Sequence, residues 1–145
     1  MIKVNVICIG KIKEDFFRAA VAEYSKRLGR FCKLAIIELP EGKNLREEGA
    51  AIIKRLEGFV VALCVEGEKL SSTQLAGSIR ELCDKGQTIT FIIGSSTGLS
   101  PEVKQAAHLK LSFSDMTFPH QLMRVVLLEQ IYRSFMINGG GEYHK

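Results

Sequence analysis

A turn made of glycine and small hydroxyl residues, Gly94-Ser95-Ser96-Thr97-Gly98, follows an apolar segment and precedes a predicted helix. Because glycine has no Cβ, such a turn lets a ligand approach the backbone, and its free N–H groups can bind polar atoms of that ligand. The same residues also suit an ordinary strand-to-helix turn in which Ser100 caps the helix. The sequence leaves these two interpretations as equal alternatives.

The turn also matches the Gly-x-Ser-x-Gly pattern of serine hydrolases, and Asp115 and His120 follow Ser96 in the order of a catalytic triad. Three observations argue against this chemistry. A nucleophile elbow needs a helix directly after the serine, whereas Ser100 and Pro101 place the helix start later. Asp115 and His120 are too close in sequence for a strand and a helix to separate them, and the chain is short for a hydrolase sheet. We therefore disfavour a hydrolase.

The other titratable side chains carry weaker signals. The neighbouring carboxylates Glu47–Glu48 and Glu14–Asp15 lie on predicted polar helix faces, where we expect them to be solvated. His120 follows a proline at the start of the last predicted helix, and a capping or surface role is favoured there over a ligand contact. The cysteines are scattered, with no Cys-x-x-Cys pair, which favours reduced core residues over zinc ligands and predicts no metal site; they are Cys8, Cys32, Cys64 and Cys83.

The chain ends in the tail Tyr143-His144-Lys145, which follows a run of glycines. Tyrosine and histidine can stack on a nucleic-acid base while lysine meets a phosphate. Arg124 and Arg133 could extend this basic surface, although Arg133 is also spaced to pair with Glu129 on one helix face. A disordered end accounts for the tail equally well.

Alternating strands and helices must position these residues. Apolar, β-branched runs predict strands at Ile2–Ile9, Lys33–Leu39, Phe59–Val65 and Thr88–Ile93, with a short fifth strand at His108–Ser114. Helical spacing predicts helices at Phe16–Leu28, Asn44–Leu56 and Ser72–Cys83, a short one from Ser100, and a last one at His120–Ile137. This order indicates an α/β fold with a mostly parallel sheet flanked by helices. Ligands of such sheets bind beyond the carboxyl ends of the strands, here the loops after Val65, Ile93 and Ser114.

Length and composition restrict the class of protein further. With 145 residues, 46% of them hydrophobic and 25% charged, residues 1–145 are expected to form one globular domain rather than a disordered or fibrous chain. The longest apolar run, Phe59–Val65, is far shorter than the ~20 residues of a membrane span, and no signal peptide is evident, so we expect a cytoplasmic protein. A net charge of +4 permits an RNA partner without requiring one.

The last predicted helix is apolar over more than one stripe of its surface. Such a helix is either central to the core or shared between the core and a second subunit. In a domain this small the second arrangement is attractive, and we predict a homodimer that uses this helix.

Three stretches resemble a known family. They are Ile92-Ile93-Gly94 with Gly98-Leu99-Ser100, then Leu111-Ser112-Phe113-Ser114-Asp115-Met116-Thr117-Phe118-Pro119-His120-Gln121-Leu122-Met123-Arg124-Val125, and the ending Tyr143-His144-Lys145. With the length and element order, they resemble the ribosomal RNA large subunit methyltransferase H family of the SPOUT class. The resemblance implies an α/β domain with a C-terminal trefoil knot, a rare exception to the rule against knots, and a homodimer. It also implies S-adenosylmethionine-dependent methylation of N3 of a pseudouridine in 23S ribosomal RNA, on the assembled ribosome.

The resemblance also assigns site residues. Its cofactor-binding positions correspond to Leu63, Gly94, Phe113, Ser114, Asp115, Met116, Thr117 and Phe118. For catalysis we single out His144 and Arg133, because the imide proton must leave N3 and a base or cation assists that step. For RNA binding we single out Tyr143, Lys145 and Arg124.

Four residues depart from the family pattern. Cys64 stands where Asp is usual, Ser95 where a second Gly is usual, Glu68 where Lys is usual, and Glu142 where Pro is usual. Ser95 could narrow the cofactor loop, and Cys64 removes a carboxylate beside it. These departures support one alternative, a non-catalytic RNA-binding or ribosome-assembly protein of the same fold.

Overall fold

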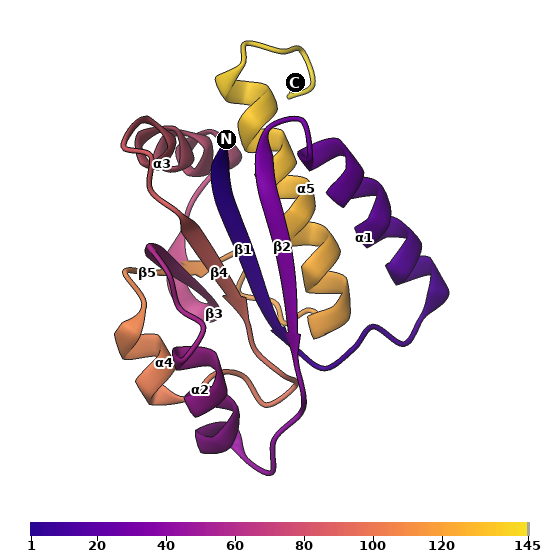
Figure 1. Cartoon of the computed structure of the whole chain (residues 1–145), viewed down its shortest axis with the longest axis vertical. Coiled ribbons are helices and arrows are strands. Elements are labelled where there is room, and N and C mark those ends of the chain that lie inside the picture. The colour runs from indigo at the N-terminus through magenta and orange to yellow at the C-terminus, as the bar shows by residue number, and fades with distance from the viewer. Residues whose placement is uncertain (145) are drawn as a thin grey trace.

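Apolar and β-branched residues build five strands that pair in parallel in the order β2-β1-β4-β3-β5. The strands are β1 (Ile2–Ile9), β2 (Cys32–Leu39), β3 (Phe59–Lys69), β4 (Ile89–Ile93) and β5 (Leu109–Ser112). The computed structural model describes residues 1–144, so Lys145 lies outside the described residues. The predicted parallel α/β sheet is confirmed (Figure 1).

Helices cover both faces of this sheet. The helices α1 (Asp15–Leu28), α3 (Ser72–Asp84) and α5 (His120–Asn138) pack on one face, and α2 (Leu45–Ile53) and α4 (Pro101–Ala106) pack on the other. Successive side chains of β1 point to opposite faces of the sheet. Val6 and Cys8 pack in the core on one face, and Ile7 and Ile9 pack in the core on the other. The sheet is therefore buried on both sides, as its continuous apolar strands predict.

Several predicted boundaries differ from the structure by one or two residues, and two differ by more. The third strand was expected to end at Val65 but runs to Lys69, with a register shift against β5 between Leu63 and Glu68. Helix α2 ends at Ile53 rather than Leu56. The expected cap of α4 is confirmed, because the Ser100 side chain accepts a hydrogen bond from the Val103 N–H at 3.3 Å and proline follows it in the first turn.

Helix α5 is covered on several sides but keeps partly accessible residues along its length. It packs between α1 and α3 on the sheet, and each of its residues is buried or half-buried (Figure 1). This explains its apolar character over more than one stripe, since three elements face it. Among residues 1–144, no helix combines the length and apolarity needed to cross a membrane.

Candidate cofactor site

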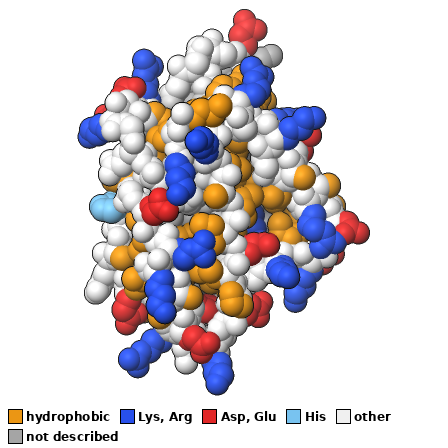
Figure 2. All heavy atoms as spheres, viewed as in Figure 1, with side chains coloured by type: hydrophobic (Ala, Val, Ile, Leu, Met, Phe, Trp, Pro, Cys, Tyr) orange, Lys and Arg blue, Asp and Glu red, His pale blue; other side chains and the backbone are white. Residues whose placement is uncertain are grey.

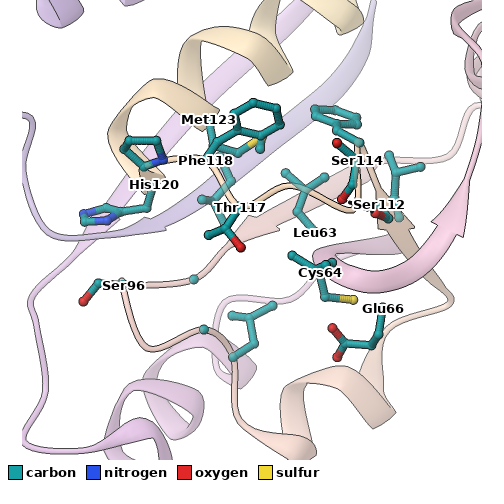
Figure 3. Close-up of a pocket in the computed structure, with 18 of the residues that line it drawn as sticks. Leu63, Cys64, Glu66, Ser96, Ser112, Ser114, Thr117, Phe118, His120 and Met123 are labelled. Carbon is teal, nitrogen blue, oxygen red and sulfur yellow. Dashed lines mark hydrogen bonds between the residues drawn. The ribbon is translucent and has the colours of Figure 1, made fainter.

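A pocket of about 530 Å³ opens at the carboxyl ends of the strands, as the parallel sheet predicts (Figure 3). Its wall comes from three places: residues 63–66 of β3, the turn after β4, and the loop from β5 into the start of α5. The volume lies in the range of small-molecule sites. The three loops expected to carry the ligand thus meet at one pocket.

The irregular part of β3 forms one wall. Leu63 and Glu68 both lie opposite Leu111 of β5, so residues 64–67 bulge out of the strand pairing. Gly67 makes this possible, because a Cβ there would lie 2.7 Å from the Lys110 carbonyl oxygen. The bulge places Cys64 and Glu66 at the pocket (Figure 3).

The glycine-flanked turn forms the second wall. The Gly98 N–H donates to the Ser95 carbonyl at 2.9 Å, and Gly98 has φ +90°, a conformation that side chains disfavour. A Cβ on Gly94 would lie 2.4 Å from the Gly98 carbonyl oxygen. Of the two interpretations of this turn, the pocket favours ligand binding, because Gly94, Ser95, Ser96 and Gly98 all line it.

The loop after β5 forms the third wall. Two hydrogen bonds hold Ser114 in place. Its carbonyl accepts from Ser112 Oγ at 3.0 Å, and its hydroxyl accepts from the Met116 N–H at 3.0 Å. Seven of the eight expected cofactor positions line the pocket: Leu63, Gly94, Phe113, Ser114, Met116, Thr117 and Phe118. Asp115 is the exception, since its carboxylate pairs with Lys69 at 2.6 Å.

His120 was not expected at the pocket, whereas Cys64 was expected beside the cofactor loop. His120 lines the pocket rather than capping α5, whose first turn has no side-chain cap (Figure 3). Cys64 also lines it, and burial raises the pKa of this thiol, so it is uncharged at neutral pH. Asp115 faces Lys69, and within residues 1–144 no hydrogen bond links it to Ser96 or His120, which leaves the hydrolase triad unformed.

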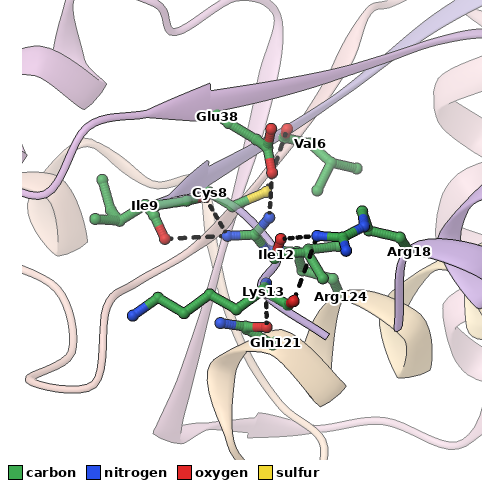
Figure 4. A network of polar contacts seen from close by, with 10 residues as sticks. Val6, Cys8, Ile9, Ile12, Lys13, Arg18, Glu38, Gln121 and Arg124 are labelled. Carbon is green, nitrogen blue, oxygen red and sulfur yellow. Dashed lines mark hydrogen bonds and ion pairs between the residues drawn. The ribbon is translucent and has the colours of Figure 1, made fainter. Parts of the chain in front are cut away.

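Arg124 is inside the protein, and the expectation that it extends a basic RNA-binding surface is wrong. Its side chain is 2% exposed, pairs with Glu38 at 2.7 Å, and donates to the Ile9 and Gly10 carbonyls at 3.0 and 2.6 Å (Figure 4). Nearby, the Gln121 side chain accepts a hydrogen bond from the Lys13 N–H at 3.1 Å. Arg124 therefore fastens α5 to the carboxyl end of β1, because that end has backbone carbonyls left to satisfy.

The tail residues gather at the other end of α5. Arg133 pairs with Glu129 as its spacing predicts, lies 3.0 Å from Nδ1 of His144, and covers the Tyr143 ring at 4.7 Å. The Tyr143 hydroxyl donates to Glu129 at 2.9 Å. Burial and this hydrogen bond raise the pKa of Tyr143, so it stays neutral. Lys145, the remaining RNA-binding candidate, lies outside the described residues.

The tail and the pocket are far apart within one chain. Met123 of α5 lines the pocket, while Arg133 lies ten residues further along the same helix. At 1.5 Å per residue this corresponds to roughly 15 Å along the axis. Figure 1 shows the tail near the N-terminus, at the end of the strands opposite the loops that follow β4 and β5. One chain does not bring the expected catalytic residues to the cofactor pocket.

Comparisons with known proteins decide the family. A family model described as "Predicted SPOUT methyltransferase" matches residues 2–144. The chain belongs to the SPOUT methyltransferase family. Two relatives named "Ribosomal RNA large subunit methyltransferase H", from Bifidobacterium adolescentis and Clostridium novyi, are 49% and 50% identical over 99% and 98% of this chain and 99% of their own lengths.

Solved structures agree on the SPOUT fold. The SpoU methyltransferase AviRb from Streptomyces viridochromogenes, in complex with AdoMet, superimposes with a TM-score of 0.53 at 11% identity, over 92% of this chain and 58% of that one. TrmJ from Z. mobilis ZM4 gives 0.54 at 11% identity, over 92% and 70%. The pocket of this SPOUT methyltransferase suits a small organic cofactor, because apolar side chains and a tight backbone turn line one cavity.

The charged surface offers no single basic face on the side viewed in Figure 2. Lys and Arg side chains are spread across it, with Asp and Glu among them and apolar surface between. This agrees with the modest net charge of +4. RNA recognition by such a surface depends on a few placed groups more than on a broad positive field.

Proposed function

We propose that this SPOUT methyltransferase methylates ribosomal RNA, at N3 of a pseudouridine in 23S RNA, and that it acts on the assembled ribosome in the cytoplasm. The observation that carries the proposal is the set of relatives named ribosomal RNA large subunit methyltransferase H, which are 44–50% identical over nearly their whole lengths. Residues 1–145 would then act as a single SPOUT domain, since the family model matches residues 2–144.

The chemistry assigns separate tasks to the pocket and the tail. The bound cofactor supplies a methyl group activated by a sulfonium. The imide at N3 must lose its proton for its nitrogen to attack, and His144 is our candidate to accept that proton or to stabilise the resulting anion. Arg133 positions His144 by donating to its Nδ1 at 3.0 Å. With that contact in place the neutral ring donates through Nε2 to the anion, and the contact must open before the ring accepts a proton. Tyr143 keeps its proton and is suited to stacking on a base, and Lys145 to an RNA phosphate.

We propose that the site is completed by a second copy of the chain. Arg133 and His144 lie at the far end of α5 from the pocket, so a partner running in the opposite direction along α5 would bring its own tail to this pocket. Half-buried apolar residues Leu122, Val125 and Met136 of α5 give such a partner a surface to cover. This supports the predicted homodimer through α5.

We also propose that the C-terminal region forms a trefoil knot. The chain leaves β5 at one edge of the sheet and returns beneath the carboxyl end of β1, where Arg124 binds the backbone of Ile9 and Gly10. Residues 113–119 therefore pass across the ends of β3 and β4. A path of this kind, close to the turn at residues 94–98, is what a knot at the cofactor site requires.

The test measures methyl transfer from labelled S-adenosylmethionine to assembled ribosomes, isolated large subunits and protein-free 23S RNA from cells that lack this enzyme. N3 carries a proton used in base pairing, so its methylation stops reverse transcription at that nucleotide. We expect a new stop at one pseudouridine with assembled ribosomes. Transfer to another kind of nucleotide would contradict the assignment, and cofactor binding without any transfer would favour the non-catalytic alternative.

A matched pair of glycine variants serves as control. Gly94→Ala places a Cβ 2.4 Å from the Gly98 carbonyl oxygen, whereas Gly77→Ala meets nothing within 4 Å. We expect the first variant to lose transfer and the second to keep it.

A further inference from the structure

Glu48 of α2 is a buried carboxylate that the proposed chemistry does not use. Glu48 is only 7% exposed, although the sequence predicted a solvated side chain at this position. Its oxygens accept from Ser95 Oγ at 2.9 Å and from the Gly42 N–H at 3.1 Å. Within residues 1–144 it forms no ion pair. A buried charge with only neutral donors is costly, so its retention calls for a reason.

Two glycines bring Glu48 against the cofactor turn. A Cβ on Gly49 would lie 2.3 Å from Ser100 Oγ, so only a glycine lets α2 approach the start of α4 this closely. A Cβ on Gly42 would lie 3.0 Å from Cγ of Glu48. The backbone around Glu48 is therefore built to hold this side chain in one place.

Ser95 links the carboxylate to the pocket wall. It lines the pocket, its hydroxyl donates to Glu48, and its carbonyl accepts from the Gly98 N–H at 2.9 Å. The Ser95 hydroxyl is thus bonded to Glu48 behind the turn. This bonding draws the side chain away from the loop that Ser95 was expected to narrow. The negative charge of Glu48 lies one side chain behind the wall.

The other carboxylate at the pocket is already matched by a cation. Glu66 lines the pocket and pairs with Lys104 at 2.5 Å, and this contact is the main reason that the pKa of Glu66 is lowered. Glu48 therefore contributes a negative charge at this wall that no described side chain balances. An unbalanced charge away from water acts on ligand charges several ångströms away.

The cofactor and its product differ in charge. S-adenosylmethionine carries a sulfonium cation, whereas S-adenosylhomocysteine carries a neutral thioether. We propose that Glu48, held by Ser95, is a specificity-determining residue that favours the cationic cofactor over the uncharged product. The proposal rests on the cofactor assignment and not on the RNA substrate, so it is tested without RNA.

The experiment is calorimetric titration of the purified protein with each of the two ligands. Glu48→Gln keeps the shape and removes the charge. Its amide oxygen can accept from the Gly42 N–H, while its NH2 group donates to the Ser95 hydroxyl, which reverses the direction of that hydrogen bond. We expect it to weaken S-adenosylmethionine binding about fivefold and to change S-adenosylhomocysteine binding less than about twofold. Equal weakening of both ligands, or no change in either, would overturn the proposal.

Two further variants separate charge from structure. Glu47→Gln removes a neighbouring carboxylate that bonds to the Lys43 N–H on the exposed side of α2, and it should leave both affinities unchanged. Glu48→Asp keeps the charge with a shorter side chain, so it should preserve the preference for S-adenosylmethionine even where both affinities fall. Loss of the preference in Glu48→Asp would also contradict the proposal.

Discussion

Cys64 places an uncharged thiol at the cofactor pocket. Burial is the main cause that raises its pKa, and the nearby Glu66 acts in the same direction. Cys83 is also half-buried with a raised pKa, but it lies on α3, away from the pocket. The two thiols are therefore comparable in burial, but only Cys64 lies at the cofactor pocket, so Cys83 can serve as its control.

Alkylation with iodoacetamide should report on Cys64 directly. The reactive form is the thiolate, so a raised pKa makes labelling slow at neutral pH and faster as pH rises toward that pKa. Saturating S-adenosylmethionine should protect Cys64 by at least about fivefold and leave Cys83 unaffected, as measured by peptide mass spectrometry. Labelling of Cys64 that ignores the cofactor would argue against the pocket as its site.

His144 and Arg133 should affect transfer but not cofactor binding. Proton transfer by a positioned side chain typically contributes about 100-fold or more, so we expect His144→Ala to lower the transfer rate on ribosomes by at least that factor. Arg133→Ala should act in the same direction because it removes the partner of His144. Arg80→Ala, an exposed arginine on α3, is the control. Normal rates in both test variants would disprove their catalytic assignment.

At the scale of elements, the attachment of α5 to β1 depends on one side chain. Arg124→Ala removes a buried ion pair and leaves the Ile9 and Gly10 carbonyls without their donor, so we expect a loss of about 3 kcal/mol in the free energy of unfolding. Arg18 pairs with Asp15 and donates to the Ile12 carbonyl at 2.8 Å, but its side chain is half exposed. Water can replace these partners, so Arg18→Ala should cost only about 1 kcal/mol. Urea denaturation measures both, and equal losses would contradict this account.

The elements were predictable where a local pattern specifies them. Continuous apolar runs indicate buried strands, and the Ser100-Pro101 pair marks a helix start; both agree with the structure. The bulge in β3 was missed because the polar residues and glycine after Val65 indicated the end of the strand, whereas the pairing with β5 resumes at Glu68. Gly67 was the one local signal of a close approach. The bulge depends on close packing against β5, and β5 is distant from these residues in the sequence.

Arg124 and Glu48 were misplaced for a related reason. A charged residue on a helix is normally solvated, and helical spacing cannot tell when another element covers it. Arg124 is buried because α5 returns to β1, and Glu48 because Gly42 and Gly49 allow close packing around it. Seven of the eight expected cofactor positions meet at one pocket, because the carboxyl ends of parallel strands lie at the same end of the sheet. Their role in cofactor binding stays a prediction.

At the scale of the whole molecule, the separation of pocket and tail predicts that each active site combines the pocket of one copy with the tail of another. Gly94→Ala should lose the pocket and keep its tail, while His144→Ala should keep the pocket and lose its tail. Each variant alone is then expected to be inactive on ribosomes. Sedimentation should give twice the mass of one chain for the wild-type protein and for both variants.

Mixing the two variants separates a shared site from a site within one chain. After subunit exchange at equal concentrations, half of the dimers are mixed, and each holds one complete site if pocket and tail come from different chains. We therefore expect about one quarter of wild-type activity to return. If the tail instead folded onto the pocket of its own chain, each chain in a mixed dimer would keep its defect. Activity would then stay absent, and the monomeric arrangement would have to be preferred.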